Sequence, residues 1–194
     1  MTIQEFNYYS YVYSPLIKTL IDQNVDFYRS NSIKKWRFDV LVDVSVVASC
    51  DRKTNLIRVN LESVIKAVQD NDVKTIEYFL LHEIRHHFQH EIISDYKNGV
   101  RDLPIGEEKN KKWIEEDKHH KKAIDDKGIF HEEYYFQDFE YDAYLYAFSV
   151  MKYKYNYTRK ELFVPSVYGE EFDKEVDDWI EQFKSEGIES KFFR

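Results

Sequence analysis

The chain has 194 residues, 43% of them hydrophobic, which suffices for one well-filled core and is short for two. A net charge of −8 argues against a nucleic-acid backbone as the main partner, because phosphate binding needs a concentrated basic face. The single cysteine, Cys50, excludes an internal disulfide, and neither a signal peptide nor a membrane-spanning stretch is apparent, so we expect one cytoplasmic domain over residues 1–194.

Apolar residues recur at helical spacing between Ser14 and Arg29, which predicts the first helix. Ser14 can cap this helix, with Pro15 in the first turn, where the missing N–H group of proline costs no hydrogen bond. The aromatic residues ahead of it, from Phe6 to Tyr13, are expected to cover the core.

Alternating apolar and polar residues then predict a strand over 37–48, a turn over 51–55 and a second strand over 57–61. We expect the two strands to form an antiparallel β-hairpin with one buried face. Asn60 can cap a helix that runs to about residue 69.

The next helix is expected from about residue 73 to 96, with Asn71 or Asp72 as its cap, and it contains the pattern H-E-x-x-H. His82 and His86 lie one turn apart on such a helix, so their imidazoles point the same way and can bind one metal ion. Glu83 is then placed beside the metal, where it can accept a proton from a metal-bound water as a general base. Two neutral nitrogen ligands suit Zn²⁺, and a catalytic zinc needs a third protein ligand and an open position.

A charged stretch follows the motif helix. Between residues 107 and 127 the chain has seven acidic and seven basic residues, a balance typical of a solvated helix. Trp113, Ile114 and Ala123 are too few to bury it deeply, so we expect a charged helical insertion over about 97–128 that forms a mobile cover near the cleft.

Two further helices are expected in the last third of the chain. The first is aromatic, runs from about residue 131 to 153, and places Phe136 and Phe139 at helical spacing with later apolar residues. The second follows Gly169 and turns four apolar residues inward: Val176, Trp179, Ile180 and Phe183.

The aromatic helix can supply the third metal ligand. Glu140 shares a face with Ala143 and Ala147, and small residues allow two helices to pack closely. Glu140 is our choice, and Asp142 and Asp138 are alternatives because the sequence does not fix the rotation of the helix.

At these residues the chain resembles the gluzincin branch of the zincin metallopeptidases, and most of all the minimal zincin core of the ImmA/IrrE type. The resemblance rests on the hairpin, the H-E-x-x-H helix and the pair Glu140 and Ala143, over roughly residues 37–96 and 131–153. It implies an α+β domain that is mainly helical, with a small antiparallel β-hairpin sheet packed on the motif helix. It also implies hydrolysis of peptide bonds.

We therefore predict a zinc metallopeptidase that acts on a polypeptide substrate, with Glu83 as general base and three zinc ligands: His82, His86 and Glu140. The rival interpretation is a catalytically silent zincin-fold module that binds a protein partner in the same groove. A zinc hydrolase that cleaves a non-peptide amide is a third interpretation, because the ligand set alone does not define the substrate.

A further group should help to stabilise the oxyanion, because zinc alone usually does not complete this task. A tyrosine hydroxyl or another imidazole is suited to it. We place Tyr144 first as a catalytic residue, and Tyr134 and His87 are alternatives.

Overall fold

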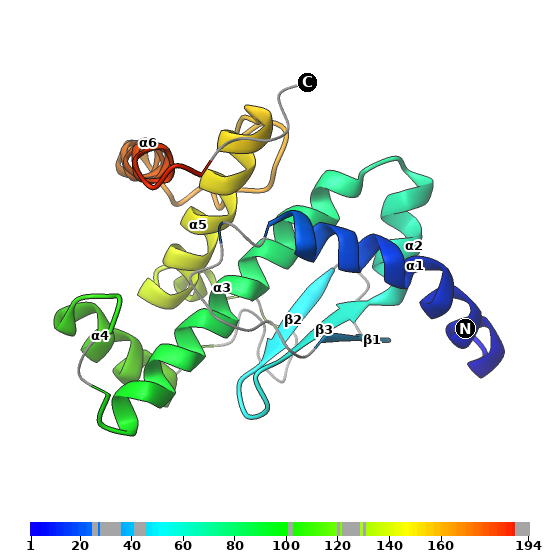
Figure 1. Cartoon of the computed structure of the whole chain (residues 1–194), viewed down its shortest axis with the longest axis horizontal. Coiled ribbons are helices and arrows are strands. Elements are labelled where there is room, and N and C mark those ends of the chain that lie inside the picture. The colour runs from blue at the N-terminus through cyan, green and yellow to red at the C-terminus, as the bar shows by residue number, and fades with distance from the viewer. Residues whose placement is uncertain are drawn as a thin grey trace.

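The computed structural model describes residues 1–24, 27, 36–40, 46–100, 103–119, 121, 129 and 131–188. Within these ranges the chain forms six α-helices, a short 3₁₀-helix and one three-stranded sheet, and it is therefore a mainly helical α+β protein, as the sequence predicts. Helix α3 (Val73–Lys97) runs through the middle of the molecule, with the sheet on one side and α5 (Asp138–Tyr155) on the other (Figure 1). No helix in the described part of the chain is long and apolar enough to cross a membrane.

The first helix, α1 (Ile3–Gln23), begins well before the predicted start. Thr2 and Glu5 form a capping box: the Thr2 hydroxyl accepts a hydrogen bond from the Glu5 N–H at 3.2 Å, and the Glu5 carboxylate accepts one from the Thr2 N–H at 2.7 Å. Ser14 is thus not the cap, and Pro15 lies inside the helix, where these end contacts and core packing outweigh one lost backbone bond. Most of the predicted extension to residue 29 lies outside the described residues.

The sheet contains β1 (Trp36–Asp39), β2 (Ala48–Asp51) and β3 (Leu56–Asn60) in the order β1-β3-β2. β2 and β3 pair antiparallel around the predicted turn, but β2 shares only Ala48 with the predicted first strand of the hairpin; β1 runs parallel to β3 and makes the sheet mixed. The single strand predicted over 37–48 is therefore wrong, because its two ends belong to different strands on opposite sides of β3. Residues 41–45, between those ends, lie outside the described residues.

Asn60 explains part of this arrangement. Its side chain donates a hydrogen bond to the Val46 carbonyl at 2.9 Å, and its backbone N–H donates to the Val47 carbonyl at 2.8 Å, so the chain that enters β2 is held at the end of β3. The same side chain accepts the backbone N–H of Glu62 at 3.3 Å and caps α2 (Leu61–Gln69), as predicted.

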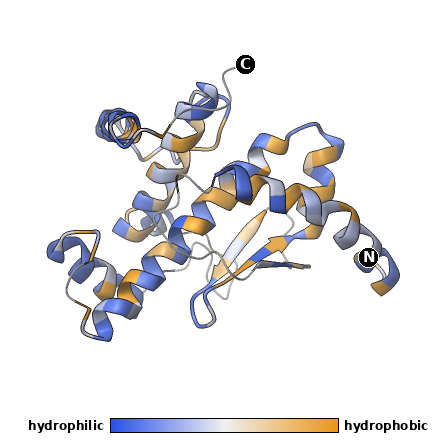
Figure 2. Ribbon diagram, in the orientation of Figure 1, coloured by the Kyte–Doolittle hydropathy of each residue, from blue (hydrophilic) through white to orange (hydrophobic). Residues whose placement is uncertain are grey.

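Helix α3 is buried on every face over its central turns, from Leu80 to Gln89. Sheet residues such as Ile57 and Val59 pack against one side, and Figure 2 shows apolar residues, in orange, along the strands next to this helix. On the other side lies α5, whose Ala143 and Ala147 are completely buried and allow close packing. The motif helix therefore forms the centre of the fold, and its polar residues are held away from bulk water.

Helix α4 (Glu107–Lys118) is more deeply anchored than its charges predict. Trp113 is completely buried in a cluster with Phe88, Ile92 and Phe139, so this residue anchors the helix to the core, which the sequence does not predict; the mobility of the segment stays a prediction. One tryptophan on an otherwise charged helix buries as much apolar surface as several smaller residues, which a count of apolar positions does not register.

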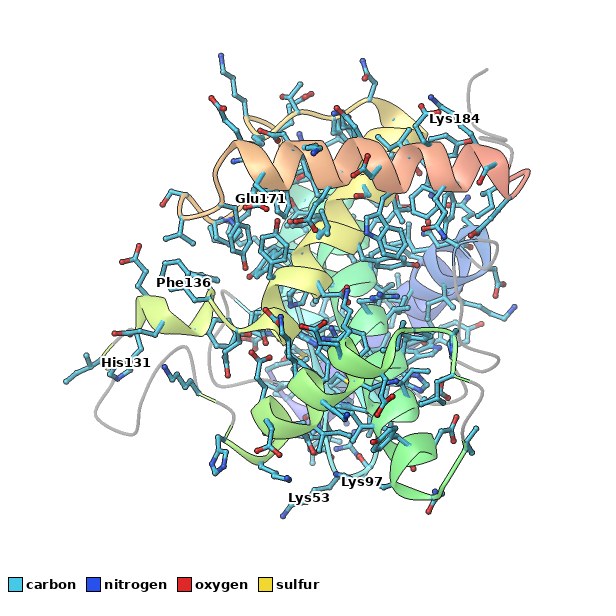
Figure 3. All side chains as sticks on the ribbon, turned by 90° about the vertical axis from the view of Figure 1, so that its left-hand side faces the viewer. Lys53, Lys97, His131, Phe136, Glu171 and Lys184 are labelled. Carbon is cyan, nitrogen blue, oxygen red and sulfur yellow. The ribbon has the colours of Figure 1, made fainter. Side chains whose placement is uncertain are left out.

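Helix α5 begins later than predicted, after a 3₁₀ turn over Glu132–Tyr134, and Phe136 is 63% exposed rather than inward. Figure 3 shows His131 and Phe136 on this turn, clear of the helices. The last helix, α6 (Glu170–Ser185), follows Gly169 as predicted and crosses α5 in the same view. It buries Phe172, Val176 and Phe183, and packs Trp179 and Ile180 against the same cluster.

Candidate metal centre

Three side chains from α3 and α5 meet at one point inside the protein. The Nε2 atoms of His82 and His86 are 3.0 Å apart, because the two residues lie one turn apart on α3. Glu140, in the first turn of α5, places Oε2 3.3 Å from Nε2 of His82 and Oε1 3.4 Å from Nε2 of His86. All three side chains are buried, and together they form a group that could hold a metal ion.

The chemistry of this group fits a cation. Burial lowers the pKa of His82, whereas at His86 the Glu140 and Glu83 carboxylates outweigh burial and raise the pKa to about 9. Oε2 of Glu140 is buried beside Nε2 of His82 but forms no well-aligned hydrogen bond among the described residues, which is costly unless a cation is bound.

The structure places Glu140, and neither of the two alternative ligands, beside the two histidines. Asp142 lies on the same helix but forms a buried ion pair with Arg85, whose Nε is 2.6 Å from Oδ2, and a second pair with Lys109. Although burial alone would raise the pKa of the Asp142 carboxyl, the two cations hold it well below its usual range. Asp138 is half exposed and lies 3.4 Å from Lys112. Only Glu140 among the three reaches both histidines.

Glu83 lies beside this group in a cavity of about 230 Å³ between β2, α3 and the start of α5. Its carboxylate accepts a hydrogen bond from the backbone N–H of Cys50, and burial raises its pKa to about 7, with Glu140 adding to the effect and His86 opposing it. The carboxyl therefore changes its protonation near neutral pH. A group of this kind can both accept and release a proton under physiological conditions.

The tyrosines occupy different places from those we expected. The ring centroid of Tyr144 is 4.3 Å from that of His82, so it packs against a ligand, but it does not line the cavity that holds Glu83. Tyr134 does line the cavity, and its hydroxyl is hydrogen-bonded to Glu140. His87 is buried outside the cavity, with Nδ1 3.8 Å from Glu91. Tyr134 is thus better placed than Tyr144 to contact a molecule bound in this cavity.

Sequence reasoning missed two residues at the site. His90, at position i+4 from His86, lines the cavity, and its Nδ1 is 3.7 Å from the Cys50 sulfur. Gln89 is completely buried, and its Oε1 is 2.7 Å from Nδ1 of His86. Their spacing from His86 is a usable signal, because residues at i+3 and i+4 lie next to one another on a helix surface.

Comparison with models of known protein families, with curated proteins and with solved structures finds no match for this chain. The assignment of the site therefore depends on its own geometry. The two strongest observations are the convergence of three candidate ligand atoms and the position of Glu83 in a cavity that His86 and Glu140 also line.

Proposed function

We propose that this chain is a zinc-dependent metallopeptidase of the gluzincin type, with His82, His86 and Glu140 as the zinc ligands. The observation that carries the proposal is the convergence of these three ligands, of which His86 and Glu140 line the same cavity as Glu83. A structural zinc site is usually closed by four protein ligands, whereas the group identified among the described residues has three. Three ligands leave one position for the reacting groups, as catalysis requires.

Zinc is the metal that this ligand set favours, because two imidazoles and one carboxylate are typical of catalytic zinc sites. When bound there, zinc would act as a Lewis acid and make water a competent nucleophile at neutral pH. Glu83 would take the proton from the attacking water on its carboxylate and pass it to the amine that leaves. Its carboxylate lies in the cavity beside two of the ligands, where it can serve both transfers.

Tyr134 is our revised candidate for the group that stabilises the oxyanion. Burial, followed by the Glu140 carboxylate, raises its pKa well above the ordinary value, so the hydroxyl keeps its proton and can donate a hydrogen bond. This hydroxyl is hydrogen-bonded to Glu140, and Tyr134 lines the cavity in which a substrate carbonyl would lie.

A polypeptide is the substrate class that the cavity favours. Strand β2 is an outer strand of the sheet, and its residues Ala48, Ser49 and Cys50 line the cavity. An extended peptide could add to this edge through backbone hydrogen bonds, which would bring one of its carbonyl groups past Glu83. The rival interpretation, a binding module, would use the same edge without cleavage.

The deciding experiment compares wild-type protein with Glu83→Gln and with Glu91→Gln as a matched control on the same helix outside this cavity. Each protein is loaded with zinc and incubated with a broad peptide library, and new termini are identified by mass spectrometry. Wild type and Glu91→Gln should cleave, while Glu83→Gln should keep its zinc and its fold but lose activity by several orders of magnitude.

Equal cleavage by wild type and Glu83→Gln would remove Glu83 as the general base. Peptide binding by both proteins, with no cleavage by either, would favour the binding module instead. Zinc content measured on the same samples separates these outcomes from a simple failure to load the metal.

A further inference from the structure

Gln89 connects a metal-ligand histidine to the helix that carries the third ligand. Its Oε1 atom is 2.7 Å from Nδ1 of His86, while Nε2 of the same imidazole lies by Glu140. Its amide nitrogen donates hydrogen bonds to the Phe139 carbonyl at 2.9 Å and to Oδ2 of Asp142 at 3.0 Å, both on α5. Both polar atoms of this side chain, the amide oxygen and the amide nitrogen, thus form hydrogen bonds inside the protein.

These contacts fix which way the amide points. The Phe139 carbonyl and the Asp142 carboxylate are both acceptors, so the NH₂ end of Gln89 must face them and its oxygen must face His86. Because an amide oxygen only accepts hydrogen bonds, Nδ1 of His86 must carry a proton. In a neutral imidazole, Nε2 then has the free electron pair, and that pair points at Glu140 and His82.

The acceptor that orients Gln89 is itself held by a buried cation. Arg85 is 3% exposed and binds Asp142 through two nitrogens, with Nε 2.6 Å from Oδ2 and Nη2 3.2 Å from Oδ1. Four aromatic rings surround its guanidinium group, each with its centroid within 5.8 Å of the Arg85 Cζ atom: Phe88, Trp113, Tyr146 and Trp179. These rings come from α3, α4, α5 and α6, so the packing of four helices holds Arg85 in place. Arg85 in turn holds the Asp142 carboxylate.

We propose that Gln89, held by the Asp142–Arg85 pair, is a positioning residue that places the His86 proton on Nδ1 and so presents Nε2 as a metal ligand. The proposal rests on the zinc site proposed above and adds the hydrogen bonds that orient one of its ligands. Such outer contacts typically change metal affinity by about 10- to 100-fold when they are removed. His82 has no equivalent, because its Nδ1 has no hydrogen-bond partner among the described residues.

The test measures zinc affinity, by competition with a chelator, for wild type, Gln89→Met and Gln137→Met. Methionine keeps the length of the side chain but removes the acceptor oxygen and the amide donors. Gln137 is the matched control, because it is also a buried glutamine, but its hydrogen bonds within the described part of the chain are to backbone groups, those of Lys121 and Tyr134. Gln89→Met should bind zinc about 10- to 100-fold more weakly than wild type, and Gln137→Met should bind it about as tightly as wild type.

A third variant, Gln89→Glu, keeps an oxygen that can accept the Nδ1 proton and should bind zinc more tightly than Gln89→Met. Equal losses in both Gln89 variants would assign the effect to packing and overturn the proposal. A second readout needs no variant: nitrogen-15 NMR of the histidine side chains in zinc-loaded wild type should show the His86 proton on Nδ1. A proton on Nε2 would also overturn it.

The same data distinguish this proposal from the proposed function. Wild-type protein that binds no zinc would overturn the metal centre itself, and with it the role of Gln89. Tight zinc binding that is unchanged in Gln89→Met would leave the metal centre intact and refute the positioning role alone.

Discussion

Replacing Lys154 with methionine should reveal how the two ligand-bearing helices are held together. The Lys154 side chain on α5 is completely buried, and its Nζ forms an ion pair with Glu77 on α3 and a 2.9 Å hydrogen bond with Asn24 Oδ1. Glu77 is 4% exposed and also accepts hydrogen bonds from the Asn24 amide at 2.8 Å and the Tyr155 hydroxyl at 3.1 Å. Lys154→Met keeps most of the apolar side chain and removes only the ammonium group.

The cost follows from the carboxylate that is left behind. Removing one partner of a buried ion pair typically destabilises a protein by about 3–5 kcal/mol, because the other charge stays buried without compensation. Two neutral donors remain beside Glu77, so we expect a value near the lower end, about 3 kcal/mol. For a chain of this size, that corresponds to a fall in Tm of about 6–12 °C.

The double variant Glu77→Gln with Lys154→Met separates charge from packing. Without either charge, no ion is buried alone, and the free energy of unfolding should return to within about 1–2 kcal/mol of wild type. The control is Lys152→Met on the same helix, whose ion pair with Asp177 is exposed to solvent and should contribute less than about 1 kcal/mol. Urea unfolding followed by circular dichroism measures all four proteins. Equal destabilisation of the single Lys154 variant and the double variant would refute the reasoning.

Three further predictions concern the site and its supports. Wild-type protein should bind about one zinc per chain, and His82→Ala or Glu140→Ala should remove it; metal retained at the wild-type level by both variants, measured by elemental analysis, would refute the ligand assignment. Trp113→Ala should destabilise the chain by about 3–5 kcal/mol in urea unfolding, because it empties the centre of a buried cluster, and a loss below 1 kcal/mol would show that α4 is only loosely attached. Burial, and then the Glu83 carboxylate, raise the pKa of the Cys50 thiol above its usual range, so a thiol reagent at pH 8 should modify native protein far more slowly than unfolded protein; similar rates would contradict this.

Local spacing in the sequence was sufficient for the first part of the site. His82, Glu83 and His86 lie on one helix, so a period of 3.6 residues defines their relative directions before any tertiary contact forms. The same local logic predicted the hairpin of β2 and β3 and the Asn60 cap, because each depends on neighbours within a few residues.

Features that depend on contacts between distant segments were harder to predict. Alternation identified strand-forming residues over 37–48 but not the partner of each, so β1 and β2 were merged into one strand. Trp113 was undervalued because its burial depends on the cluster formed by α3, α4 and α5. In both cases the amino-acid pattern reports which residues avoid water, while the fold decides what they contact.

The third candidate ligand depends on contacts that spacing within one helix does not predict. Two alanines on one face favoured Glu140, but Asp142 and Asp138 remained alternatives because the rotation of α5 about its axis is not encoded in its own periodicity. That rotation depends on packing: Asp142 turns to Arg85, Asp138 turns to solvent beside Lys112, and Glu140 turns to the histidines. Local spacing by itself determined which residues of α3 share a face. Only packing between helices, across more than fifty residues of chain, decided which carboxylate that face meets.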